Sequence, residues 1–150
     1  DVPVYVSQGA ADLGVVGQDI LYEQSPNVLT LCDLAFGNCS LIIAGPNPIL
    51  PDDLTHHLRV ATKFTNSAQR YFEKKGLNVK IIKLYGAIEL APITGLSDII
   101  CDLMATGTTL KENKLHVIDT VYTSTAHLIA NPVSIKIHDM FIRNLVSQLA

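Results

Sequence analysis

The chain lacks the features of a membrane protein, a nucleic-acid-binding protein or a disulfide-rich secreted domain. Its apolar runs end well before the roughly 20 residues that cross a bilayer, and its start has no basic-then-apolar signal pattern. A net charge of -3 argues against the basic surface that nucleic acid requires. The three cysteines show no CxxC spacing, and an odd number of thiols without a signal peptide favours reduced thiols. We therefore expect a cytoplasmic protein that binds neither membrane nor nucleic acid.

Metal-ligating side chains are not clustered in the sequence either. The five histidines do not share metal-ligand spacing with the cysteines. The adjacent His56 and His57 are interpreted as a solvated pair rather than as a metal site. We therefore expect no metal held by protein side chains alone.

The hydrophobic content of 48% in 150 residues is enough for one domain with a core, or for two small lobes. Apolar, β-branched segments alternate with helical ones, which indicates an α/β fold with a largely parallel sheet. Expected strands are 13–17, 28–34, 39–44, 59–62, 79–84, 97–103, 115–122 and 126–130. Expected helices are 19–24, 66–75 with Asn66 as its cap, a short start at 52–54, 88–93, 109–113 and 137–149. The break at 45–51 is interpreted as a hinge.

The segment from Glu89 to Leu110, ELAPITGLSDIICDLMATGTTL, combines an apolar strand, two aspartates and a Thr-Gly-Thr-Thr loop. A strand that opens through Thr and Gly into a helix start is suited to an anion, because free backbone N–H groups and hydroxyls converge there. Acids beside such a loop suit sugar hydroxyls or a metal ion. The alternative is a simple helix cap, since Thr is a good N-cap residue. The Walker ending Gly-Lys-Ser/Thr and the GxGxxG pattern are both absent.

The same segment resembles the signature of the ATP phosphoribosyltransferase family. The residues at the matching positions are Glu89, Gly95, Ser97, Asp102, Thr106, Gly107, Thr109 and Leu110. Further resemblances are the glycine motif at 9–17, Leu34–Cys39 with its Phe-Gly-x-Cys pattern, Arg59–Lys63, and Tyr71-Phe72. The resemblance runs from Asp1 to about Lys136, and its several ordered motifs make it specific.

The resemblance implies a two-lobed α/β fold, similar to type II periplasmic binding proteins, with a cleft between the lobes. The first lobe would comprise 1–46 and about 120–150, and the second 47–119. The implied reaction joins N1 of ATP to the anomeric carbon of phosphoribosyl pyrophosphate, releases pyrophosphate, and opens histidine biosynthesis. Mg²⁺ would accompany the substrate pyrophosphate. Positioning and electrostatic stabilisation would supply most of the rate, so no acid, base or nucleophile is assigned.

Site residues follow from the matched positions. The 5′-phosphate is assigned to Thr106, Gly107, Thr108 and Thr109, and the ribose hydroxyls to Asp102. Asp98 is a second, weaker candidate for the ribose hydroxyls. The spacing agrees equally well with an Asp98 side chain that points into solvent. Glu89 and Asp12 are further candidates for residues that line the cleft. The alternative for Glu89 is an ordinary acid in the first turn of a helix, and the alternative for Asp12 is an ordinary acid in a turn. Arg59 and Lys63 are either anion contacts or members of surface charge pairs.

Two departures from the family pattern affect the expected activity and assembly. Ser40 stands where a basic residue usually follows the Phe-Gly-x-Cys cysteine, and the N-terminal Lys-Gly-Arg segment is absent. We expect upstream sequence to be missing and the chain alone to be weakly active or inactive. The C-terminal end of the sequence resembles that of the short form of the family. The short form implies a homo-oligomer, or a hetero-oligomer with a histidyl-tRNA-synthetase-like regulatory subunit. A truncated long form would end in the same way.

Two other functions share this fold. One is a non-enzymatic two-lobed small-molecule-binding protein, because glycine motifs like GAADLGVVG occur there and fold does not dictate function. The other is a regulatory module that has lost catalysis. The ribose-phosphate loop favours the transferase over both.

Overall fold

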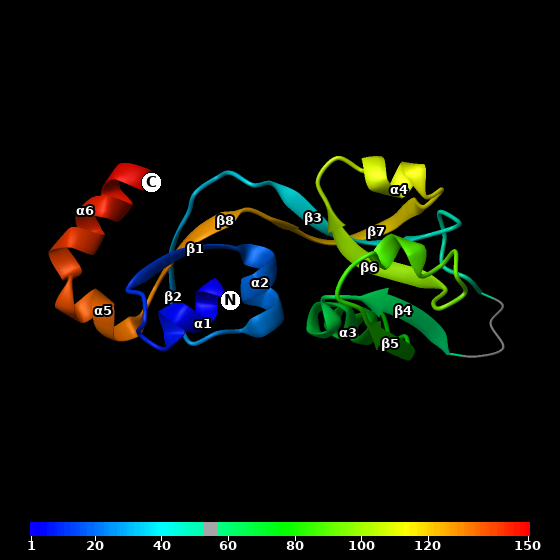
Figure 1. Cartoon of the computed structure of the whole chain (residues 1–150), viewed down its shortest axis with the longest axis horizontal. Helices are drawn as coiled ribbons and strands as arrows, with labels where there is room; N and C mark the ends of the chain where they lie inside the picture. Colours follow the sequence, from blue (N-terminus) through cyan, green and yellow to red (C-terminus); the bar gives the residue numbers. More distant parts are fainter. Residues whose placement is uncertain (53–56) are drawn as a thin grey trace. The chain divides into compact units, whose positions relative to one another are not determined.

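The computed structural model describes residues 1–52 and 57–150, which form two compact units (Figure 1). Unit 1 comprises Asp1–Asn38 and Ser124–Ala150, and unit 2 comprises Cys39–Thr123. No helix within these described residues is long and apolar enough to cross a membrane. The expected helix start at 52–54 and the His56 side chain involve residues 53–56, which lie outside the described part.

Unit 1 is a three-stranded antiparallel sheet with four helices. Its elements are α1 (Val2–Ser7), β1 (Leu13–Gly17), α2 (Gln18–Gln24), β2 (Leu29–Asp33), β8 (Ala126–Ala130), α5 (Pro132–Ile137) and α6 (Asp139–Leu149). The strand order is β1-β8-β2, and β8 runs antiparallel to both neighbours. Every residue of β8 is buried, so this returning strand forms the centre of the unit.

Unit 2 is a five-stranded mixed sheet. Its elements are β3 (Cys39–Gly45), β4 (Leu58–Thr62), α3 (Thr65–Lys74), β5 (Val79–Lys83), the 3₁₀ turn η1 (Ile88–Leu90), β6 (Ile99–Met104), α4 (Thr108–Glu112) and β7 (His116–Ser124). The strand order is β5-β4-β6-β3-β7. β4 is parallel to both β5 and β6, whereas β3 is antiparallel to β6.

The sheet of unit 2 is covered on both faces by short elements. On one face Ile42, Ala61 and Ile100 pack with Ile88 of η1 and Leu110 of α4. Cys101 alternates with Ile100 along β6 and therefore faces the other side. There it lies near Tyr71 of α3. Figure 1 accordingly shows α3 and α4 on opposite sides of these strands.

The structure corrects several sequence predictions. The largely parallel sheet is wrong for unit 1, because β8 returns from the far end of the chain rather than through a crossover helix. Helix α3 begins at Thr65 after Phe64, so Asn66 lies inside the helix and is not its cap. The helix expected at 137–149 is α6, which begins at Asp139, and the sequence prediction missed the helix α5 that precedes it and ends at Ile137.

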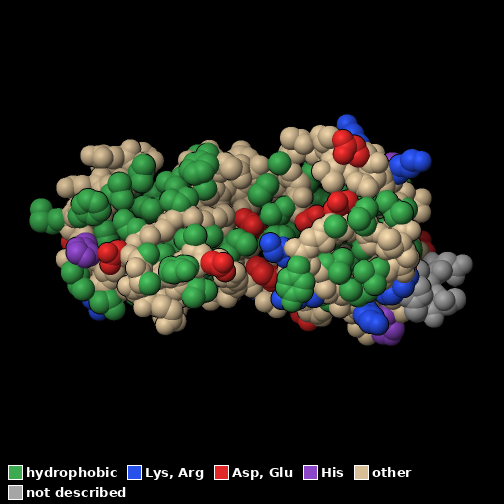
Figure 2. All heavy atoms as spheres, in the orientation of Figure 1, with side chains coloured by type: hydrophobic (Ala, Val, Ile, Leu, Met, Phe, Trp, Pro, Cys, Tyr) green, Lys and Arg blue, Asp and Glu red, His purple; other side chains and the backbone are tan. Residues whose placement is uncertain are grey.

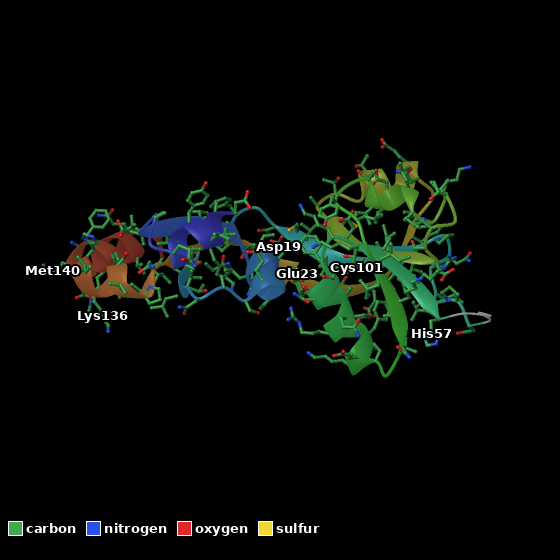
Figure 3. All side chains as sticks on the ribbon, turned by 60° about the horizontal axis from the view of Figure 1, so that its bottom comes forward. Asp19, Glu23, His57, Cys101, Lys136 and Met140 are labelled. Carbon is green, nitrogen blue, oxygen red and sulfur yellow. The ribbon has the colours of Figure 1, made fainter. Side chains whose placement is uncertain are left out.

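The unit boundaries also differ from the expected positions 46 and 120. They fall at 38/39 and 123/124, because β3 pairs with β6 from Ser40 onward and so joins unit 2 before the Gly45–Pro51 break. The apolar face of the C-terminal helices is largely exposed. Figure 3 shows Met140 projecting from α6 on the outside of unit 1, and 79% of its surface is accessible.

Asn131 joins three separate parts of unit 1. Its Oδ1 accepts hydrogen bonds from the backbone N–H groups of Val133 and Ser134, at 2.8 and 3.2 Å, and thereby caps α5. Its Nδ2 donates to the carbonyl oxygens of Val6 and Ser7 at the end of α1. The residue is 8% exposed, so water cannot readily replace these four bonds.

We predict that Asn131→Ala lowers the free energy of unfolding by about 1–3 kcal/mol, because it removes the cap of α5 and the side-chain donor to the carbonyl oxygens at the end of α1. Urea titration followed by circular dichroism measures this loss. Asn144→Ala, at an exposed position of α6, is the matched control and should change stability by less than about 0.5 kcal/mol. Equal stability of the two variants would contradict the prediction.

Candidate active site

The winding of unit 2 reverses between β4 and β6. From β4 the chain passes through α3 to β5 on one side, and then crosses to β6 on the other side of β4. Ligands of open α/β sheets bind beyond the carboxyl ends of parallel strands at such a reversal. In this unit that edge carries Lys63 after β4 and residues 105–109 after β6.

A pocket of about 320 Å³ lies at this edge. It is lined by Glu89, Asp102 and the loop that contains Thr106, Gly107, Thr108 and Thr109. The structure therefore brings six of the eight predicted site residues together. Their elements are η1, the end of β6 and the start of α4.

Gly107 shapes the loop. It has φ +80° and is the N-cap residue of α4. Only glycine adopts this backbone conformation without strain. The first N–H groups of a helix have no partner inside the helix, and the Thr106 and Thr108 hydroxyls lie 3.1 Å apart beside them. The loop thus offers several donors to an anionic ligand.

Asp102 supplies the acceptor next to these donors. It shares the sheet face of Ile100, which is otherwise apolar, and burial is the main reason why its pKa is raised above the ordinary 3.8. The negative charge of Glu89 raises the pKa of Asp102 further, whereas the Leu103 N–H, which donates to Oδ1 at 2.9 Å, and the Lys63 ammonium lower it. The site therefore holds a carboxylate that gains from a hydrogen-bond donor or a cation.

Asp98 is engaged elsewhere. It precedes β6, at the opposite end of the strand from Thr106, and its carboxylate accepts hydrogen bonds from the Arg59 guanidinium and backbone N–H. The Arg59 guanidinium also donates to the Gly95 carbonyl oxygen at 3.1 Å. Arg59 and Asp98 thus form the charge pair that was one of the two alternatives for Arg59, and we no longer assign Asp98 to a ligand.

Asp12 belongs to unit 1 and has a local partner. Its Oδ1 accepts a 2.6 Å hydrogen bond from the Ser134 hydroxyl. It lines a separate cavity of about 480 Å³ with Leu13, His138, Phe141 and Ile142. The structure gives Asp12 a role in holding α5 against the start of β1.

Positive charge is concentrated in unit 2. Of the 11 Lys and Arg residues, only Lys136 and Arg143 belong to unit 1, so nine lie between Cys39 and Thr123. Most of the blue side chains in Figure 2 accordingly lie over the elements of unit 2. Unit 2 also holds eight of the 14 Asp and Glu residues, so its net charge is +1, against -4 for unit 1.

Sequence reasoning missed one pair at the same edge. Tyr85 follows β5, and Lys83 Nζ lies 5.3 Å from the centre of its ring. The signal that could have identified it was a tyrosine between the apolar end of a strand and a glycine, a position that a buried core does not require.

Comparison with known proteins identifies the family. A family profile described as "HisG: ATP phosphoribosyltransferase" matches residues 1–150. The chain belongs to the ATP phosphoribosyltransferase family. Members of this family are transferases that open histidine biosynthesis, so the resemblance drawn from the sequence is confirmed.

The relatives agree over almost the whole chain. An ATP phosphoribosyltransferase of Caldanaerobacter subterraneus subsp. tengcongensis is 51% identical over 149 residues, which are 99% of this chain and 70% of the relative. One from Rubrobacter xylanophilus is 48% identical over 154 residues, 99% of this chain and 71% of the relative.

Solved structures support the predicted fold class. The "ATP phosphoribosyl transferase (HisG:HisZ) complex from Thermotoga maritima" includes a chain that is 39% identical, with a TM-score of 0.88 over 99% of this chain and 73% of its own length. The alkanesulfonate-binding protein SsuA from Xanthomonas axonopodis pv. citri matches with a TM-score of 0.62 over 98% of this chain and 57% of its own, at 13% identity. The second likeness shows the fold alone, and together with the first it confirms the expected periplasmic-binding-protein-like fold.

We predict that Asp98→Asn lowers the free energy of unfolding by about 1–3 kcal/mol, because hydrogen bonds to charged groups are strong and the Asp98 side chain is only 13% exposed. The affinity for phosphoribosyl pyrophosphate should stay unchanged. Asp139→Asn, which removes an exposed pair with Arg143, is the control and should cost less than about 0.5 kcal/mol. A loss of ligand affinity at unchanged stability would contradict this assignment.

The raised pKa of Asp102 predicts a pH effect of definite sign. Folding disfavours its ionised form, so Asp102 lowers stability as the pH rises from about 3.8 through the folded-state pKa. Asp102→Asn keeps an acceptor for the Leu103 N–H but no longer ionises. The variant should be more stable than the original chain at neutral pH, and the difference should shrink as the pH falls toward 3.8. Urea titrations at several pH values measure it, and a constant difference would contradict it.

Proposed function

We propose that the pocket at the carboxyl edge of β6 binds phosphoribosyl pyrophosphate, and that the chain transfers its phosphoribosyl group to N1 of ATP. The observation that carries this proposal is the placement of two carboxylates beside a Thr-Gly-Thr-Thr loop in one pocket. A sugar phosphate presents the same two chemistries, hydroxyl donors next to an anion.

Each part of the pocket has a distinct task. The Thr106, Thr108 and Thr109 hydroxyls and the N–H groups around Gly107 donate to the 5′-phosphate. Asp102 accepts hydrogen bonds from the ribose hydroxyls, which compensates the desolvation of its carboxylate. Glu89 lines the same pocket as a second acceptor, and its negative charge stabilises positive charge that develops on the ribose ring.

The reaction needs positioning more than covalent chemistry. The N1 lone pair of adenine forms a bond to the anomeric carbon while the bond from that carbon to the pyrophosphate oxygen breaks, and the electron pair leaves with pyrophosphate. The adenine amino group then releases a proton to water. The carboxylates of Asp102 and Glu89 favour the cationic ribose of the transition state.

Mg²⁺ enters this scheme as part of the substrate. The described residues hold no group of three or more His, Cys, Asp or Glu side chains that could bind a metal. Mg²⁺ usually takes one or two carboxylates together with substrate phosphates. We therefore assign the ion to the pyrophosphate of the substrate.

The proposal extends to assembly and location. The Thermotoga maritima structure is named as a HisG:HisZ complex. This name supports a hetero-oligomer of this chain with a histidyl-tRNA-synthetase-like subunit. We propose that a homo-oligomer of this chain forms the base of that assembly. Exposed apolar side chains of α5 and α6, such as Ile137 and Met140, offer surface for such assembly. We place the assembled enzyme in the cytoplasm, where its substrates are made.

We predict that Gly107→Val weakens the binding of Mg²⁺-phosphoribosyl pyrophosphate by at least about tenfold. A side chain at φ +80° costs about 1–2 kcal/mol and displaces the N–H groups that face the phosphate. Calorimetric titration of the ligand into each protein measures the affinity.

Gly76→Val is the matched control. Gly76 has φ +69° at the end of α3 and open space around it, so this variant should lose similar stability and keep the affinity. Absence of binding to the unsubstituted chain, or equal losses in the two variants, would contradict the proposed site.

A further inference from the structure

Lys63 brings a positive charge to the edge of the sheet that carries the pocket. It directly follows β4 and its side chain is exposed. Among the described residues, no carboxylate forms an ion pair with it, whereas Arg59 is paired with Asp98 and Lys75 with Asp119. The Lys63 ammonium is therefore available to an anionic ligand.

The strand register places Lys63 next to Asp102. Thr62 pairs with Cys101 across β4 and β6, and Lys63 and Asp102 are the residues that follow them. Side chains alternate along a strand, so both lie on the face of Ile100, which packs against η1 and α4. The two strands are about 4.8 Å apart, and the Lys63 ammonium is close enough to lower the pKa of Asp102. Lys63 thus stands on the β4 side of the pocket.

The Thr106–Thr109 loop lies on the other side of Asp102. The loop leaves the end of β6 and enters α4, which leads to β7 (Figure 1). The strand order β5-β4-β6-β3-β7 puts β7 and β4 on opposite sides of β6. Leu110 of α4 accordingly packs in one cluster with Ile42 of β3. Asp102 therefore stands between the loop and Lys63.

This order matches the order of the groups in phosphoribosyl pyrophosphate. Around the ribose ring, the 5′-phosphate is attached next to C4, the hydroxyls are on C3 and C2, and the pyrophosphate is on C1. A carboxylate that accepts from both hydroxyls thus has the 5′-phosphate on one side and the pyrophosphate on the other. With the 5′-phosphate in the Thr106–Thr109 loop and the hydroxyls at Asp102, the pyrophosphate points toward Lys63.

We propose that Lys63 binds the pyrophosphate group of phosphoribosyl pyrophosphate. The inference rests on the proposed function, because the loop and Asp102 fix the direction of the ligand. An ammonium on a flexible stem is a compact point charge, which suits a group that carries several negative charges. When the bond from the anomeric carbon to the pyrophosphate oxygen breaks, its electron pair stays on that oxygen. Lys63 stabilises the negative charge that this adds to the leaving group.

The test is calorimetric titration of Mg²⁺-phosphoribosyl pyrophosphate, Mg²⁺-pyrophosphate and ribose 5-phosphate into the original chain and its variants. Lys63→Met should weaken the two ligands that contain pyrophosphate by about tenfold or more, as expected for one hydrogen bond between charged groups. Its affinity for ribose 5-phosphate should stay within about twofold of the original, because that ligand has no group at Lys63. Lys63→Arg keeps the charge and should retain all three affinities within about threefold.

Lys80→Met is the matched control. Lys80 is exposed and pairs with Arg59 in the strand register, so it lies on the sheet face of Lys63 but at the opposite end of the strands. It should leave all three affinities unchanged. An unchanged affinity of Lys63→Met for phosphoribosyl pyrophosphate would overturn the inference. An equal loss for phosphoribosyl pyrophosphate and ribose 5-phosphate would also overturn it, because Lys63 would then act only through Asp102.

The same titrations with Gly107→Val separate this inference from the proposed function. Binding of both sugar phosphates that is weakened by Gly107→Val but not by Lys63→Met would overturn the role of Lys63 and leave the pocket assignment standing. Binding of the pyrophosphate-containing ligands that is weakened by Lys63→Met but not by Gly107→Val would support the role of Lys63 and contradict the loop assignment. Absence of binding of all three ligands to the original chain would contradict both.

Discussion

The parallel pairing of β4 with β6 is the constraint on which the rest of unit 2 depends. It sets Thr62 beside Cys101 and so brings the carboxyl ends of both strands to one edge. Because α3 covers one face and η1 with α4 covers the other, the elements diverge at that edge and leave a pocket instead of a packed core. The Thr106–Thr109 loop, to which the proposed phosphate contacts belong, leaves the sheet at this edge.

Two residues of the pocket lower the free energy of unfolding. Asp102 continues the face that Ile42 and Ile100 make apolar, and Gly107 holds a backbone conformation that contributes little to the core. Elsewhere the same chain compensates its charges locally, as Arg59 does for Asp98. Asp102 is compensated only in part, by the Leu103 N–H and the charge of Lys63, and Glu89 acts against it. A carboxylate in that position is typical of a site that is completed by its ligand.

The sequence predicted the α/β class, most strands and the association of Glu89 and Asp102 with the Thr-Gly-Thr-Thr loop. These predictions were possible because the pattern of a strand and the residues of a turn lie within a few positions of each other in the sequence. It did not predict the antiparallel centre of unit 1, since β1 and β8 are distant in sequence. It could not separate Asp98 from Asp102, because both are acids at the same apolar strand and only the distant Arg59 distinguishes them.

The chain enters and leaves unit 2 through neighbouring strands. β3 begins at Cys39 and β7 ends at Ser124, and the two strands are hydrogen-bonded to each other in the sheet. Unit 2 is therefore an insertion with adjoining ends, which two cuts in the gene would release as a continuous segment. Such a segment can be exchanged between relatives in one piece, and it would carry the proposed sugar-phosphate pocket with it while the host lobe keeps its own sheet.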